Sequence, residues 1–161
     1  MKVFWTLVGL LTALLVESAL SRVAPGWARF FDPFLLVLVY CGLTGGETHG
    51  MLAGAAAGWV QDIQFGGTIL GLTGLTDVLL GFAVGLAGTR FLLIGTAPRL
   101  LVLIGATLLQ AALFERWASV FDIPVHGLSP TGLLVRCLAN SLVGVLAFEV
   151  IDARLHRGVR P

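Results

Sequence analysis

Five polar side chains interrupt stretches that are otherwise apolar, and they are the groups of this sequence best able to form an ion pair or bind a ligand. They are the acids Glu17, Asp62 and Asp77, the base Arg136 and the amide Asn140. A charge at the centre of a bilayer costs about 2.5–3.5 kcal/mol on insertion scales. These side chains are therefore expected to face protein or water rather than lipid.

The spacing of these residues predicts that several of them meet. Arg136 and Asn140 are four residues apart and share one face of a helix. Arg136 lies in the first third of its apolar stretch, on the same side of the membrane as Asp62 and Asp77, so it can pair with either acid. One interpretation is an internal salt bridge that fixes the helix register. The other is a polar cluster that binds a ligand or a partner helix.

The sequence shows no enzyme motif. It contains no His-Glu-x-x-His, no nucleophile elbow, no Cys-x-x-Cys and no phosphate-binding loop. The three histidines lack metal-ligand spacing, and Cys41 and Cys137 lie in apolar runs where a thiol is a small buried side chain. We therefore predict no catalytic residue, no cofactor and no metal site.

Composition and length predict an all-α integral membrane protein, a bundle of about six transmembrane helices that forms a single transmembrane domain over residues 1–161. The chain is 57% hydrophobic and 12% charged, whereas about a quarter of the residues of a soluble domain are charged. A spanning helix takes roughly 20 residues. The second span is expected to begin near Trp27. The predicted spans are about 3–20, 34–43, 50–63, 69–86, 98–113 and 131–151.

The distribution of lysine and arginine predicts the orientation of these spans. With the N-terminus in the cytoplasm, six basic residues lie inside, whereas Arg22, Arg29 and Arg116 lie outside. Both termini are therefore expected in the cytoplasm. The net charge of +1 gives no basic surface for nucleic acid. The six residues expected inside are Lys2, Arg90, Arg99, Arg154, Arg157 and Arg160.

Glycines at four-residue spacing mark two of the predicted spans. Gly50, Gly54 and Gly58 share one helix face, and Gly81 and Gly85 share another. Such faces allow a neighbouring backbone to come close. They predict either tight packing between the third and fourth spans of this chain or an interface with a partner protein or a substrate.

The order of motifs along the chain resembles the rod shape-determining protein MreD family. Glu17-Ser18 falls where relatives often have Gln-Ser or Gln-Thr, and Asn140 in the last span also suits the family. The chain departs from the commoner form in the order of Asp32 and Pro33 and in the acid at Glu17. The motifs are Asp-Pro-Phe-Leu at 32–35, Gly-Gly-Glu-Thr-His-Gly at 45–50, Gln-Asp at 61–62, Gly-Gly-Thr-Ile-Leu-Gly-Leu at 66–72 and the spaced glycines.

This resemblance implies a non-enzymatic scaffold of the bacterial elongation machinery in the inner membrane, which helps maintain rod shape by organising lateral peptidoglycan synthesis. The implied partners are MreC, the MreB filament, a RodA-type glycosyltransferase and a penicillin-binding transpeptidase, besides membrane lipid. The family fold is similar to the substrate-binding subunit of energy-coupling-factor transporters. The alternative function is therefore a vitamin-type transporter subunit, with Asp77, Arg136 and Asn140 in its pocket.

Overall fold

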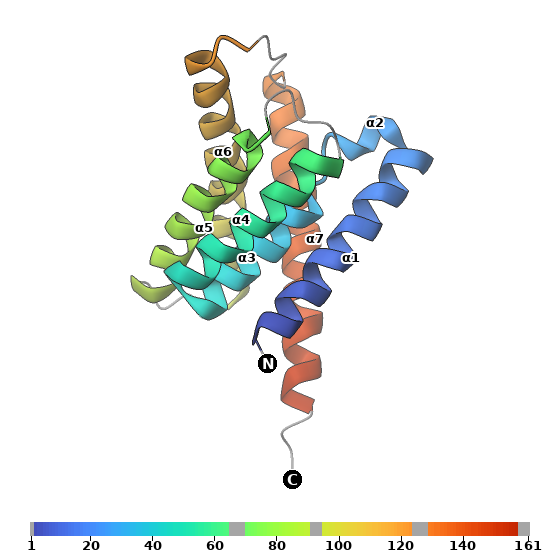
Figure 1. The fold of residues 1–161 in the computed structure, drawn as a ribbon. Helices are drawn as coiled ribbons and strands as arrows, with labels where there is room; N and C mark the ends of the chain where they lie inside the picture. Colours follow the sequence, from blue (N-terminus) through green and yellow to red (C-terminus); the bar gives the residue numbers. More distant parts are fainter. Residues whose placement is uncertain (1, 65–69, 91–94, 124–128, 158–161) are drawn as a thin grey trace.

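The computed structural model describes residues 2–64, 70–90, 95–123 and 129–157, and these residues form helices without any strand (Figure 1). The Gly66-Gly67 part of the loop motif lies outside them. The first helix begins and the last helix ends at the same end of the bundle. The helices are α1 (Lys2–Val23), α2 (Pro25–Ala28), α3 (Pro33–Gly45), α4 (Glu47–Gln64), α5 (Leu72–Arg90), α6 (Thr96–Val120) and α7 (Pro130–Arg157).

Five segments of the described chain are long and apolar enough to cross a membrane, one fewer than the expected number of about six. They are Phe4–Val23, Pro25–Gly45, Leu72–Arg90, Thr96–Val120 and Pro130–Arg154. The remaining long helix is α4, which has 18 residues and carries Glu47, Gln61 and Asp62. These polar residues and its many small ones make α4 less apolar than the five segments.

Helix α3 forms the centre of the bundle and contacts α1, α4, α5, α6 and α7. Its side chains Leu35, Leu38 and Val39 are fully buried in the main apolar core, together with Leu80 of α5 and Leu103 of α6. Its 13 residues span only about 20 Å. Such a short helix is stable at membrane depth because protein covers it on several sides.

The second predicted span does not begin as one continuous helix near Trp27. The short helix α2 ends at Ala28, and α3 starts only at Pro33. Asp32 precedes α3 with extended backbone angles, φ −121° and ψ 94°, and its carboxylate accepts a hydrogen bond from the Leu35 N–H. Proline at the first helical position, preceded by an aspartate cap, starts a new helix at this point.

The last two predicted spans are longer in the structure than in the prediction. Helix α6 continues through Glu115 to Val120, and α7 continues to Arg157. No proline or glycine lies between the predicted and the observed end of either helix, and polar residues alone do not stop a helix. The two helices are tied near the chain termini by the Arg99–Asp152 ion pair (2.6 Å) and by a hydrogen bond from Thr96 to Glu149 (2.8 Å).

Helices α4 and α5 pack through the spaced glycines. A Cβ added at Gly54 would overlap the carbonyl oxygen of Asp77, and one added at Gly50 would overlap the carbonyl oxygen of Gly81. An added Cβ at Gly85 would lie 2.5 Å from the Cα of Glu47. The glycine faces predicted from the sequence therefore cover each other within this chain. They do not offer an open surface to another protein.

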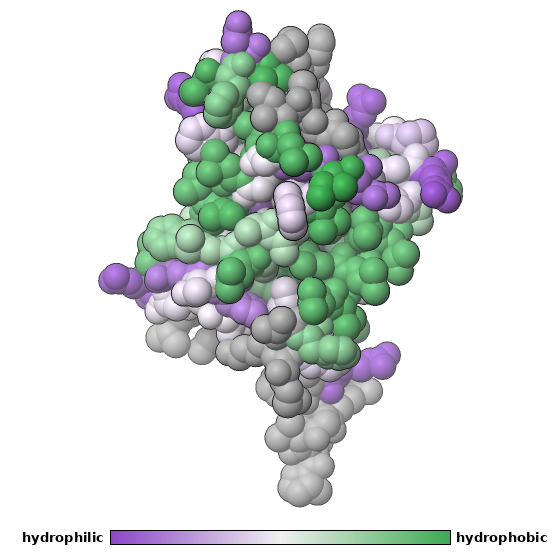
Figure 2. All heavy atoms as spheres, viewed as in Figure 1, coloured by the Kyte–Doolittle hydropathy of each residue, from purple (hydrophilic) through white to green (hydrophobic). Residues whose placement is uncertain are grey.

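The surface of the bundle agrees with a position in lipid. Figure 2 shows apolar side chains over much of the middle of one face, with hydrophilic side chains gathered toward its upper and lower parts. Large apolar side chains of α1 and α7 are among the most exposed of the molecule, for example Leu11 and Leu138, each 59% exposed. Such a surface requires an apolar surrounding.

Candidate functional site

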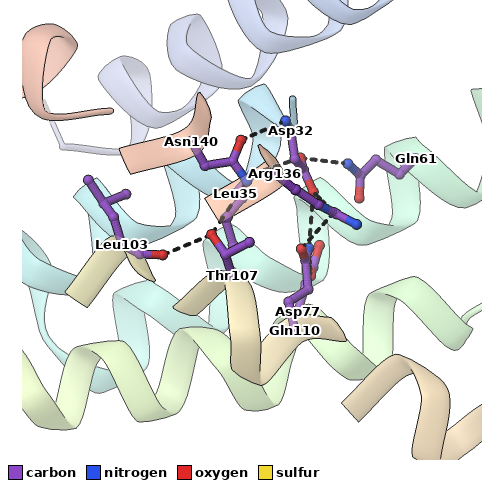
Figure 3. A network of polar contacts seen from close by, with 9 residues as sticks. All are labelled: Asp32, Leu35, Gln61, Asp77, Leu103, Thr107, Gln110, Arg136 and Asn140. Atoms are coloured by element: carbon purple, nitrogen blue, oxygen red, sulfur yellow. Dashed lines mark hydrogen bonds and ion pairs between the residues drawn. The ribbon is translucent and has the colours of Figure 1, made fainter. Parts of the chain in front are cut away.

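The polar residues of the bundle gather around Asp32, directly before the first residue of α3 (Figure 3). Asp32 is only 6% exposed. Its Oδ1 accepts hydrogen bonds from the Leu35 N–H (3.0 Å) and from Gln61 Nε2 (3.1 Å). The break before α3 thus places a carboxylate inside the bundle, within reach of α4, α6 and α7.

Arg136 of α7 pairs with this carboxylate. Its Nη2 lies 3.1 Å from Asp32 Oδ2 and also donates to Gln110 Oε1 at 2.9 Å. The sequence had suggested Asp62 or Asp77 as the partner of Arg136, and the structure selects neither. Asp32 precedes the second predicted span, so the sequence does not indicate it as the partner of Arg136. The late start of α3 brings it beside α7.

Gln110 of α6 connects the ion pair to Asp77 of α5. Its Nε2 donates to Asp32 Oδ2 and to Asp77 Oδ1, both at 3.1 Å. Asp77 is completely buried, and its Oδ2 has no hydrogen-bond partner among the described residues. Asp77 therefore belongs to the same network as Arg136, through an amide bridge instead of a direct ion pair.

Asn140 closes the network on the opposite side of Asp32. Its Oδ1 accepts a hydrogen bond from the Asp32 backbone N–H (3.0 Å), and its Nδ2 donates to Thr107 Oγ1 (3.4 Å). Arg136 and Asn140 thus do lie on one face of α7, as their spacing predicts. Together they satisfy both the side chain and the backbone of Asp32, where the chain is not helical.

Asp62 lies outside this network and has a separate role. Its Oδ2 accepts hydrogen bonds from the backbone N–H groups of Gly71 (2.8 Å) and Gly74 (3.3 Å), and its Oδ1 accepts from Thr73 (3.4 Å). These groups belong to the first turn of α5, where N–H groups have no partner within the helix. Asp62 of α4 therefore caps α5 and complements the positive end of its dipole.

Replacement of Asp62 by alanine is expected to lower the free energy of unfolding by about 1–2 kcal/mol, since it removes the cap of α5. Asp62→Asn keeps an acceptor oxygen and is expected to lose less. Unfolding of the two variants in lipid bicelles measures the difference. Equal losses in both variants would show that only the negative charge of Asp62 matters.

Glu17 of α1 lies at the edge of the network. It is half-buried and close enough to Asp32 and Arg136 for electrostatic interaction. Its Oε2 is buried and has no hydrogen-bond partner among the described residues. Of the five polar residues singled out in the sequence, Asp77, Arg136 and Asn140 join one network, Glu17 borders it and Asp62 is separate.

The sequence reasoning missed Asp32, Gln61, Gln110 and Thr107 as members of the site. Gln110 carried a usable signal, because a glutamine in the middle of a long apolar helix needs a polar partner. Asp32 carried another, because an aspartate directly before a proline is a typical helix start. Neither signal identifies which helices meet.

The network is suited to holding four helices and the start of α3 in one arrangement. Its hydrogen bonds join α3, α4, α5, α6 and α7. Among the described residues, no group of three or more His, Cys, Asp or Glu side chains is arranged to hold a metal ion. The ionisable groups at its centre are the carboxyl groups of Asp32 and Asp77 and the guanidinium of Arg136.

Comparison with known proteins identifies a family for this chain. A family model described as rod shape-determining protein MreD matches residues 2–143. No curated protein and no solved structure matches the chain.

Proposed function

Because the chain belongs to the rod shape-determining protein MreD family, we propose that it is a non-enzymatic membrane scaffold that organises lateral peptidoglycan synthesis. The family has a role in rod shape determination and is structural in character. The match over residues 2–143, which include α1 to α6 and the first half of α7, is the observation that carries the proposal. The buried network supports it, because its polar atoms mainly bind one another and fix the helices.

The direct partner in this proposal is MreC, bound through its transmembrane helix, with MreB, a RodA-type glycosyltransferase and a penicillin-binding transpeptidase in the wider assembly. The glycine faces of α4 and α5 are covered within the chain, so the partner helix must use another surface. Helix α1 offers one: little of its span is buried, and Phe4, Leu7 and Leu15 are each about 60% exposed.

We place the protein in the bacterial inner membrane with both termini in the cytoplasm. Both termini lie at one end of the bundle in Figure 1, which requires an even number of crossings. The five apolar segments and α4 together give six. The bias of basic residues toward the end with the termini supports this orientation.

Co-purification tests the partner. The tagged chain, extracted in mild detergent from membranes that contain MreC, is expected to bring MreC with it, as measured by the amount of MreC per tagged chain. An unrelated multi-pass protein with the same tag serves as the control. Recovery of the inserted chain without MreC would contradict the proposed interaction.

The alternative of a vitamin-type transporter subunit has one point in its favour. Asp77, Arg136 and Asn140, which suggested a pocket, do meet in one network. Their contacts within the chain, however, occupy most of their polar atoms. Specific binding of a vitamin by the purified chain, or a gene position beside a transporter ATPase, would favour this alternative over the scaffold.

A further inference from the structure

The polar network contains more carboxyl groups than basic groups. Asp32, Asp77 and Glu17 are carboxylic acids, whereas Arg136 is the one base that the described part of the chain brings to them. Asp32 Oδ2 is the oxygen that Arg136 contacts, while Asp77 Oδ2 and Glu17 Oε2 are buried without a partner. An unpaired buried carboxylate is costly in a bilayer, so each of these acids needs either a bound proton or a basic side chain beside it.

The network is accessible from the side of α1 and α7. Asp77 and Asn140 are fully buried, whereas Glu17 and Gln61 are only partly buried and the Arg136 side chain is 22% exposed. Helix α1 packs on α3 and α4, and α7 packs on α3 and α6, but the described residues of α1 and α7 make no close backbone contact. A cation therefore reaches the network most directly between α1 and α7, at Glu17.

The surroundings of this entrance favour a helix over a free ion. The outer surfaces of α1 and α7 carry exposed leucines, such as Leu15 and Leu134, and they face lipid rather than water. A hydrated ion or a soluble amine would have to lose its water to pass along them. A transmembrane helix satisfies its own backbone groups in lipid and can carry one basic side chain to this depth.

We propose that a lysine or arginine of the partner's transmembrane helix enters between α1 and α7 and forms an ion pair with Glu17. This inference rests on the proposed function, since it specifies how the partner helix is recognised. Charge complementarity at Glu17 supplies specificity, while the apolar sides of α1 and α7 supply contact area. Arg136 remains paired with Asp32, so the incoming base meets the Oε2 atom of Glu17, which has no hydrogen-bond partner among the described residues.

Glu17→Gln tests the pairing, because the amide keeps the size of the side chain and removes its charge. Removing one charge of a buried ion pair weakens binding strongly, because the other charge is left buried and unpaired. We therefore expect at least about a tenfold loss of MreC affinity in detergent or nanodiscs. Glu149→Gln is the matched control, because it removes a carboxylate from α7 near the opposite end, and it is expected to bind as the unchanged chain does.

Charge reversal separates recognition from folding. Glu17→Lys is expected to abolish the complex, and changing one Lys or Arg in or beside the partner helix to Glu is expected to restore it. If Glu17→Gln binds MreC like the unchanged chain, or if no reversal restores binding, the ion pair is refuted, and protons are then the cations that compensate the network. The proposed function itself fails only if the unchanged chain does not bind MreC.

Photo-crosslinking gives a measurement that does not depend on changing Glu17. Leu14 and Leu133 lie one turn before Glu17 and Arg136 and are partly buried. A photoreactive residue at either position is expected to crosslink to the partner helix. The same residue at Leu79, which is 38% exposed on α5, is the control and is expected not to crosslink. Crosslinks from Leu79 but from neither of the other positions would place the partner elsewhere and overturn the inference.

Discussion

Replacement of Gly54 by alanine is expected to force α4 away from α5 and to destabilise the whole bundle. The added Cβ would overlap the backbone carbonyl of Asp77 and lie near the backbone nitrogen of Val78. A backbone carbonyl cannot rotate away as a side chain can, so the two helices must separate. Overpacking typically costs roughly 1–3 kcal/mol, and we expect a loss at the upper end of this range or beyond it.

Gly105→Ala is the matched control for Gly54→Ala. Gly105 also lies inside a helix, α6, but a Cβ added there would have no heavy atom within 4 Å. Alanine favours helix over glycine by roughly 0.5–1 kcal/mol, so this variant is expected to be at least as stable as the unchanged chain. Reversible unfolding in lipid bicelles measures both variants. Equal stability of Gly54→Ala and Gly105→Ala would show that α4 and α5 are not in close contact.

The close packing of α4 on α5 makes substitutions at their glycines unsuitable as tests of partner binding. Leucine at Gly54 or Gly58 would be a natural way to block a glycine-lined partner interface. In this chain the same substitutions would disrupt the packing of α4 on α5. Loss of MreC from such variants would therefore report a damaged fold rather than the position of the partner.

Replacement of Asp32 by alanine is expected to cost about 3–5 kcal/mol of stability, because it leaves Arg136 as an unpaired, largely buried charge. The change also removes the cap of α3 and the acceptor of Gln61 and Gln110. Asp32→Asn keeps an acceptor for the Leu35 N–H but loses the charge. Its stability is therefore expected to lie between that of the unchanged chain and that of Asp32→Ala. Thermal unfolding in detergent measures the effect, with the loss of monodisperse protein as the readout.

Asp152→Ala provides a matched contrast for Asp32→Ala. Asp152 also pairs with an arginine of a neighbouring helix, but both side chains of the Arg99–Asp152 pair are more than a quarter exposed. Ion pairs of this kind contribute about 1 kcal/mol or less. A similar loss in both variants would mean that burial of the Asp32–Arg136 pair adds nothing to its importance.

The sequence was informative about the site where polar residues stand out against apolar neighbours. Asp77, Arg136 and Asn140 could be singled out in this way, and their meeting in one network was among the interpretations considered. The partner of Arg136 could not be predicted, because it depends on where α3 begins. That start is fixed by Asp32 and Pro33 together with the contact of Asn140 to the Asp32 backbone, which joins residues 108 positions apart.

The sequence by itself determined that the chain is a helical membrane protein and indicated its family, since both follow from local properties: apolar runs of spanning length and an ordered set of short motifs. Only the tertiary structure decided which faces are occupied and which acid holds Arg136. Glycine spacing shows that a backbone can approach, but not whose backbone it is. Likewise, a buried charge shows that a partner is needed, whereas the packing of the helices selects that partner.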